Sequence, residues 1–269
     1  MHLLYCDESN IERRAGDFLV YGGIFIPSEQ AGSLSGEIER IRVDAGLSPE
    51  VRLKFNPRPE GFTHQEFITL KQRIIEASIE HECKFLAYVV LHDLAGVPDN
   101  ARRFGINTVC YHFHCVLNRV GGSGLVLIDR FNDANNEIDA HLKQKMNVGI
   151  QLPYRNAPTR LTNITGFHYS AIGQSHFTSL VDIFVGSFRF AVNIHTRNDE
   201  RLRENGLTVL RVLAPAFYRY PGGDRVPDIG LCFSPMNVRL DHFREKYRSL
   251  QAFMREGGVD SSQRIGRAR

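Results

Sequence analysis

Three aspartates lie at the end of an apolar segment or inside one. Asp7 follows the run Met-His-Leu-Leu-Tyr-Cys, and Asp129 follows Leu125–Ile128. Asp182 lies within the apolar segment 180–185. Carboxylates are preferred ligands of Mg²⁺ and Mn²⁺, and two such ions about 3.5 to 4 Å apart can hold the attacking and leaving oxygens of a cleaved phosphodiester. If the fold brings the three aspartates together, their chemistry is metal-dependent phosphoryl transfer.

Asp182 is the most informative of the three. It lies well past the first turn of its helix, where an acid would act as a cap, and burying an unpaired carboxylate is costly. Small and polar residues share its helix face at steps of three and four, namely Ser175, Ser179, Gly186, Arg189 and Asn193. This stripe predicts a polar cavity beside Asp182. The alternative is a buried ion pair between Asp182 and Arg189.

Asp7 and Asp129 each have a purely structural explanation as well. The tetrapeptide Asp7-Glu8-Ser9-Asn10 has the composition of a turn between two strands. Asp129 would act as a helix cap if the next helix began near Asp133. The sequence alone leaves both alternatives open.

Four further residues are candidates for supporting roles. Glu8 directly follows the first aspartate and would add a ligand, although strand alternation normally sends it to the opposite face of the sheet. Asp133 is a further acidic candidate. Lys54 would balance the charge of a substrate phosphate, and His168 would assist proton transfer if its strand leads into the site. The alternatives for these last two are a solvated lysine and a hydrogen-bonded histidine.

Hydrophobic periodicity predicts the elements that must position these side chains. The first two predicted strands form a hairpin, and Thr63 with Glu66 forms a helix capping box. Strands are predicted at 2–6, 18–26, 84–91, 124–128 and 164–169, with a brief extended piece at 51–55. Helices are predicted at 28–45, 63–81, 102–120, 135–148 and 175–194.

This alternation predicts an α/β fold with a mixed sheet flanked by helices, in which ligands gather at the carboxyl ends of the strands. We expect residues 1–197 to form the main domain, with a helical insertion at about 28–82. Residues 198–269 are expected to form a C-terminal extension. Its predicted parts are a strand-like segment at 207–213, a helix at about 239–256 and a loose basic tail at 257–269.

The composition is that of a soluble globular protein, with 42% hydrophobic and 23% charged residues in a chain of 269. No apolar run approaches the roughly 18 to 20 residues that span a bilayer, and the opening residues lack the features of a signal peptide. Five cysteines, mostly among apolar residues, suit buried thiols in a reducing compartment. We therefore expect a cytoplasmic protein without a membrane partner.

Charge is unevenly distributed along the chain. From residue 198 onward there are 13 Lys and Arg against 9 Asp and Glu, whereas the whole chain has a net charge of only +3. A basic excess in a tail more often serves solubility than binding, so it favours a polyanionic partner only slightly.

The segment Cys110–Cys115 contains two cysteines and two histidines, which are all good zinc ligands. It is predicted to be helical, and only residues three or four apart share a helix face, so the four side chains cannot converge on one ion. Helix packing is the better interpretation. The sequence also offers no nucleophile elbow and no glycine-rich phosphate loop, which argues against other hydrolase classes.

Taken in order, the acidic motifs resemble those of the domain-of-unknown-function 3800 family, a branch of the ribonuclease H-like superfamily. The opening Tyr5–Ser9 is similar to that family's strand ending in Asp-Glu-Ser, and Tyr21–Ile24 to its following strand. Leu127–Arg130 is similar to its central acidic strand, and Leu180–Ile183 to its closing Leu-Ala-Asp-Leu helix. The resemblance spans about residues 1–195.

The sequence departs from the family pattern at three places. Asn10 stands where Gly is usual, and Ser179 where Gln is common. Leu53-Lys54 lacks the Glu that many members place before Lys. These departures bear on the number of bound ions and the reaction rate more than on the fold.

The resemblance implies a ribonuclease H-like fold and a nuclease whose Mg²⁺ or Mn²⁺ ions are held by Asp7, Asp129 and Asp182. Its substrate would be nucleic acid, either RNA or DNA. The alternative is a non-catalytic module that binds nucleic acid or protein on the same fold. Only an enzyme should gain thermal stability from millimolar Mg²⁺ or Mn²⁺.

Overall fold

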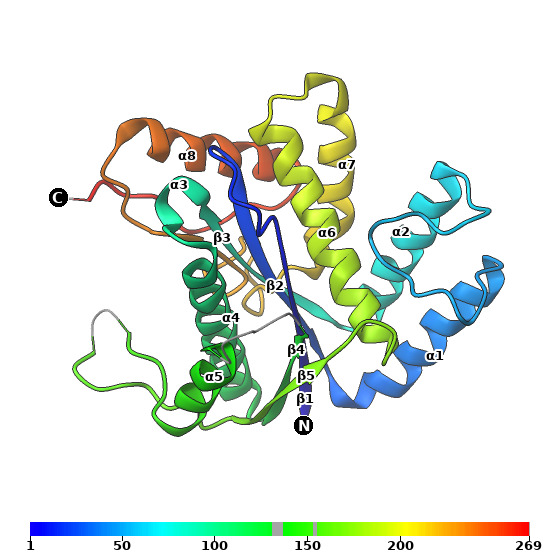
Figure 1. Cartoon of the computed structure of the whole chain (residues 1–269), viewed down its shortest axis with the longest axis horizontal. Coiled ribbons are helices and arrows are strands. Elements are labelled where there is room, and N and C mark those ends of the chain that lie inside the picture. Colours follow the sequence, from blue (N-terminus) through cyan, green and yellow to red (C-terminus); the bar gives the residue numbers. More distant parts are fainter. Residues whose placement is uncertain (131–136, 153–154, 269) are drawn as a thin grey trace.

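A mixed six-stranded sheet forms the centre of the protein (Figure 1), in a computed structural model that describes residues 1–130, 137–152 and 155–268. The order across the sheet is β5 (Ile164–Ser170), β4 (Gly124–Asp129), β1 (His2–Ser9), β2 (Phe18–Ile26), β3 (Lys84–Leu91) and β6 (Leu231–Ser234). The strands β1, β2 and β3 are antiparallel neighbours, whereas β4 and β5 run parallel to β1. β6 runs parallel to β3. The architecture is therefore α/β with helices on both faces of the sheet.

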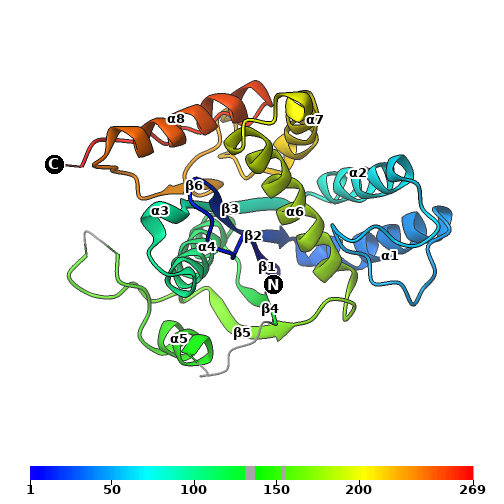
Figure 2. The same cartoon turned by 45° about the horizontal axis from the view of Figure 1, so that its top comes forward.

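Two hydrophobic clusters, one on each face of the sheet, lie between the sheet and the helical layers that Figure 2 shows. One face is covered by α1 (Ser28–Asp44), α2 (His64–Glu80), α6 (His176–Thr196), α7 (Arg203–Leu213) and α8 (Asp241–Glu256). The other is covered by α4 (Pro98–Val120) and α5 (Glu137–Asn147). The short α3 (His92–Ala95) and two 3-10 turns, Glu200–Leu202 and Ala214–Ala216, complete the described elements. Helix α6 crosses the first face diagonally over the central strands (Figure 1).

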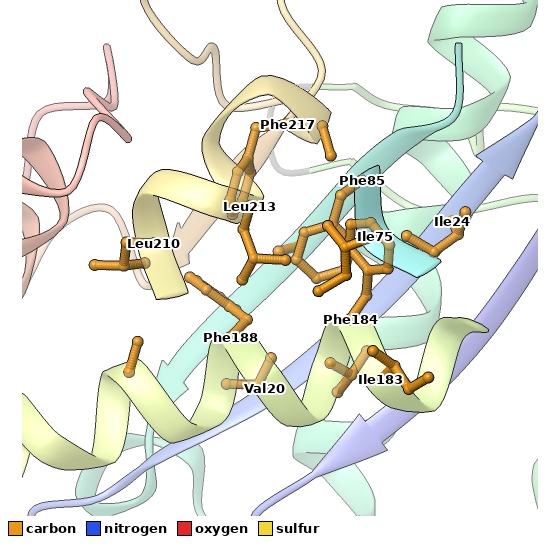
Figure 3. Packing of buried hydrophobic residues seen from close by; sticks show 14 of the residues in the cluster. Val20, Ile24, Ile75, Phe85, Ile183, Phe184, Phe188, Leu210, Leu213 and Phe217 are labelled. Atoms are coloured by element: carbon orange, nitrogen blue, oxygen red, sulfur yellow. The ribbon is translucent and has the colours of Figure 1, made fainter. Parts of the chain in front are cut away.

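Every residue of β2 is buried, which explains its continuous apolar sequence. On the α6 side its side chains meet Phe85 of β3 and Phe184 and Phe188 of α6 (Figure 3). Gly22, which is in register with Asp7 of β1, has no space for a side chain because Val185 of α6 lies directly over it. The glycine therefore lets α6 approach the sheet closely beside Asp7.

The predicted strands and the opening hairpin are confirmed with small boundary differences. The capping box is also confirmed, because the Thr63 hydroxyl accepts from the Glu66 backbone and the Glu66 carboxylate accepts from the Thr63 backbone. Local signals placed these elements correctly because each side of the sheet is covered by helices that bury it.

Two expectations for the C-terminal part are wrong. The strand-like segment 207–213 lies in α7, where Leu207, Leu210 and Leu213 are buried at helical spacing. The tail after α8 is not loose, since Val259 and Ile265 are buried and Gln263 exchanges hydrogen bonds with the Phe233 backbone. Residues 198–268 thus contribute an edge strand and two packed α-helices to the same body.

One helix of the described residues, α6, is long and apolar enough to cross a membrane by length and composition alone. However, 83% of its apolar stretch is buried inside the protein. Its hydrophobicity is explained by contact with the sheet on one side and with other helices around it.

Candidate functional site

Asp7 and Asp129 lie side by side at the carboxyl edge of the sheet. β1 and β4 are adjacent and parallel, and their register pairs Cys6 with Ile128, one residue before each aspartate. Because side chains alternate along a strand, both aspartates share the face of Tyr5 and Leu127, which belong to or pack against the cluster under α6. The sheet alone therefore brings two of the three predicted carboxylates to one face.

Asp182 reaches the same place from α6, which crosses that face. The charge of Asp182 acts on both Asp7 and Asp129, and the charge of Asp129 acts on Asp7. The three residues, which are 122 and 53 positions apart along the chain, therefore form one electrostatically coupled group.

Burial raises the pKa of all three carboxyl groups. For Asp7 the pKa lies well above its ordinary range, first because of burial and then because Glu8, Asp182 and Asp129 are also negative. A backbone N–H bond from Glu8, 2.8 Å long, opposes this rise. The pKa of Asp129 and that of Asp182 are raised mainly by burial, while Lys54 lowers both. A cation bound among them would remove a repulsion that the described side chains leave in place.

The loop between α1 and α2 supplies the partners of Asp182. The backbone N–H of Phe55 donates a hydrogen bond to the Asp182 carboxylate. Lys54, the preceding residue, acts electrostatically on both Asp129 and Asp182. The predicted supporting residue Lys54 therefore lies near two of the three carboxylates.

The polar stripe of α6 serves more than one purpose. Gly186 lies directly under Phe55, and the Asn193 side chain exchanges hydrogen bonds with that of Asn10. Among the ion pairs in the described part of the chain, none joins Asp182 to Arg189, although the Arg189 charge lowers the pKa of Asp182. Gly186 thus lets the α1–α2 loop lie against α6, Asn193 binds the turn between β1 and β2, and the alternative of a closed Asp182–Arg189 ion pair is not formed.

Glu8 lies on the opposite face of β1. Its carboxylate forms an ion pair of 3.1 Å with Arg102 of α4, and both side chains are almost completely buried. Burial raises the pKa of Glu8 to about 7 against the lowering effect of Arg102. Glu8 is therefore engaged on the α4 side, as strand alternation predicts, and does not face Asp182.

The other two supporting candidates have different outcomes. His168 of β5 is in register with Leu127 of β4, so it lies on the face of the sheet that carries Asp7 and Asp129. Its side chain is exposed and lies over Gly166 of its own strand. A role for His168 in proton transfer stays a prediction. Asp133 lies outside the described residues.

Lys71 of α2 is a neighbour of the site that sequence reasoning missed. Its ammonium lies 4.2 Å from the ring centroids of both Phe55 and Phe67, and 3.5 Å from the Phe55 carbonyl oxygen. Burial lowers its pKa to about 8, while the Asp182 charge opposes that shift. In the sequence, Lys71 could be related only to Phe67, four residues earlier on the same helix. That spacing does not indicate that Lys71 lies near Asp182.

The three carboxylates have the oxygen atoms that a hard divalent cation prefers, but the side chains are not arranged around a single ion position. All three side chains offer carboxylate oxygens, the ligand type of Mg²⁺ and Mn²⁺. Within residues 1–130, 137–152 and 155–268, no three His, Cys, Asp or Glu side chains are arranged as a ready metal site. The Asp182 carboxylate instead bonds to the Phe55 N–H.

The Cys110–Cys115 segment lies within α4, as predicted. His112 is buried near Asp228 and hydrogen-bonds to the backbone of Ile229. His114 instead contacts Asn118 and the backbone of Asn163. The two histidines thus have separate neighbours in the packing of α4.

No protein-family model, curated protein or solved structure matches the chain. Any functional assignment therefore depends on the chemistry of the carboxylate group and the residues around it.

Proposed function

We propose that the chain is a divalent-metal-dependent nuclease of ribonuclease H-like type. The observation that carries this proposal is the coupled group of Asp7, Asp129 and Asp182, which comes from two adjacent parallel strands and a crossing helix. A purely structural role would not need three carboxylates with raised pKa values on one face of the sheet. Such clusters of perturbed acids are typical of functional sites.

The order of the strands supports the ribonuclease H-like part of the proposal. Three antiparallel strands run β3, β2, β1, and β4 and β5 then continue the sheet parallel to β1. These directions fit a ribonuclease H-like sheet, with α6 as the closing helix that carries the third acid. The short sequence motifs noted above occur at the corresponding places.

The chain's own residues would each have a distinct task. Asp7, Asp129 and Asp182 would hold Mg²⁺ or Mn²⁺, which supplies charge neutralisation and a more acidic bound water. Lys54 places a positive charge beside Asp129 and Asp182, where it can attract a phosphate. The Phe55 N–H orients the Asp182 carboxylate through its hydrogen bond.

A cleavage assay combined with thermal melts tests the proposal. Labelled single-stranded and duplex RNA and DNA, and an RNA–DNA hybrid, are incubated with the protein in Mn²⁺, Mg²⁺ or EDTA. We expect cleavage of at least one substrate that needs the metal, and a rise in melting temperature with millimolar Mn²⁺. Asp129→Ala should lose both, whereas Asp224→Asn, which changes an exposed acid elsewhere, should lose neither.

A non-catalytic binding module on the same fold is the second candidate. The observation that favours it is the Asp182 carboxylate, which already has a partner in the Phe55 N–H. A module of this kind would show the same melting temperature with Mn²⁺ and with EDTA, and Asp129→Ala would leave nucleic-acid binding unchanged.

A further inference from the structure

A polar cleft of about 730 Å³ continues the α6 stripe beyond the carboxylate group. It is lined by the first turn of α6, by the loop before that helix and by the segment after α1. Ser179 and Ser175, which precede Asp182 by three and seven positions on the same helix face, both line it. The helix rise of about 1.5 Å per residue places Ser175 roughly 10 Å from Asp182 along the axis.

One hydroxyl of this cleft is buried without a partner. It belongs to Ser175, whose Oγ makes no hydrogen bond within the described part of the chain. Ser179, one helical turn further along α6, is only 5% exposed and also lines the cleft. Since most buried hydroxyls in proteins are hydrogen-bonded, the unpartnered Ser175 hydroxyl indicates that a ligand completes it.

The start of α6 is also uncapped. No side chain caps its N-terminus, and its first turn contains no acidic residue. The first N–H groups of a helix and its dipole favour an anion, and α6 is 21 residues long. The free N–H groups and the serine hydroxyls are all hydrogen-bond donors, which is what phosphate oxygens require.

Two arginines add positive charge to the cleft. Arg42 is buried, and its side chain donates to the Val51 carbonyl oxygen at 2.9 Å. Arg52 is exposed and lies against Gly173 in the loop before α6. Glu39 at the rim, whose side chain is 45% exposed, lies 3.4 Å from the Arg42 Nε and competes for it.

We infer that this cleft binds a phosphate group of the nucleic-acid strand whose cleavage is proposed above, at a short distance along α6 from the carboxylate group. The inference rests on the proposed function for the identity of the strand. The phosphate would accept hydrogen bonds from Ser175, Ser179 and the α6 N-terminus, with Arg52 as its counter-ion. Such a contact fixes the register of the strand without reading its sequence.

Binding without metal tests the inference separately from catalysis. The affinity of the full chain for a labelled single-stranded DNA oligonucleotide is measured by fluorescence anisotropy in EDTA, over a series of salt concentrations. We expect Arg52→Gln to weaken binding and to reduce the slope of log affinity against log salt by about 0.7, the value of one phosphate contact on a single strand. Arg58→Gln, which removes an exposed charge outside the cleft, should leave the slope unchanged.

Two further variants should change the affinity for the oligonucleotide in opposite directions. Ser179→Ala should weaken binding with little change in slope, because it removes a neutral donor. Glu39→Gln should tighten binding, because it releases Arg42 from a competing carboxylate. Thermal melts of each variant confirm that it is folded, and Arg52→Gln is the safest of them because the side chain is exposed.

Several results would overturn the inference. One is the absence of oligonucleotide binding in EDTA, and another is an Arg52→Gln slope equal to that of wild type. Competition by millimolar inorganic phosphate without any effect of Arg52→Gln on the oligonucleotide would mean that the cleft takes free phosphate only. If metal-dependent cleavage fails while the Arg52 and Glu39 effects are found, the proposed function is wrong and the phosphate cleft remains.

Discussion

The carboxylate of Asp182 accepts a hydrogen bond from the backbone N–H of Phe55, which lies 127 residues earlier in the chain. This bond joins the core helix α6 to the loop between α1 and α2. The same loop brings Lys54 near the acidic group, and Phe55 packs on Gly186 one turn further along α6. The position of the third carboxylate and the position of the loop are therefore coupled.

Two replacements of Asp182 distinguish the effect of its charge on stability from the effect of its hydrogen bond. Burial raises the pKa of Asp182, so Asp182→Asn removes a disfavoured charge and keeps an oxygen that can accept from Phe55. We expect a melting temperature in EDTA equal to or above that of wild type, and no stabilisation by Mn²⁺. Asp182→Ala should cost about 1 to 3 kcal/mol in EDTA, because the part-buried Phe55 N–H loses its acceptor. A large loss of stability in the Asn variant would contradict this account.

Lys54 should affect how the free energy of unfolding depends on pH. Its charge lowers the pKa of both Asp129 and Asp182, so Lys54→Met should raise those pKa values further. A folded state whose carboxyl pKa is raised binds more protons than the unfolded state, so its stability falls as the pH rises above about 4. Urea unfolding in EDTA at pH 5 and pH 8 should show a larger decline for Lys54→Met than for wild type. The control Lys143→Met, on the exposed face of α5, should decline as wild type does.

Gly186 should be necessary for the seating of the α1–α2 loop. A Cβ at this position would lie 2.4 Å from the Phe55 Cγ, which forces the loop to move. We expect Gly186→Ala to destabilise the protein by roughly 1 to 3 kcal/mol and to reduce stabilisation by Mn²⁺. Gly36→Ala is the matched control, because it is also within a helix and has no atom within 4 Å of the new Cβ. That change should stabilise the protein by about 0.5 to 1 kcal/mol, measured by urea unfolding.

His112 should make the protein less stable in acid. Burial lowers its pKa from 6.5 to about 4, so it stays neutral in the folded state while the unfolded chain becomes protonated. Its contribution to stability is therefore complete above pH 6.5 and is lost as the pH falls toward 4. At about 1.4 kcal/mol per unit, the loss amounts to roughly 3 kcal/mol. The stability difference between wild type and His112→Gln should shrink by about this amount between pH 7 and pH 4, and a constant difference would contradict the assignment.

The sequence by itself determined the local elements and the edge at which the site lies. Continuous apolar runs predicted β2 and β3, and a longer apolar segment predicted α6, because each of these elements buries most of its surface in the core. Asp7 and Asp129 were expected at one edge because each ends an apolar strand, and parallel strands end at the same edge of a sheet. The face of Glu8 likewise follows from strand alternation alone.

Only the tertiary structure decided the partners of these residues. The Phe55 N–H, the Lys71 ammonium and the Arg102 guanidinium come from elements far away in the chain, and no local pattern encodes which of them meets Asp182 or Glu8. The C-terminal segments were misjudged for the same reason. Val259 and Ile265 are separated by polar residues, so their burial depends on the surface that β6 and α8 provide after packing. Periodicity reports which side of an element is buried, whereas the identity of the neighbour is decided by how the elements pack together.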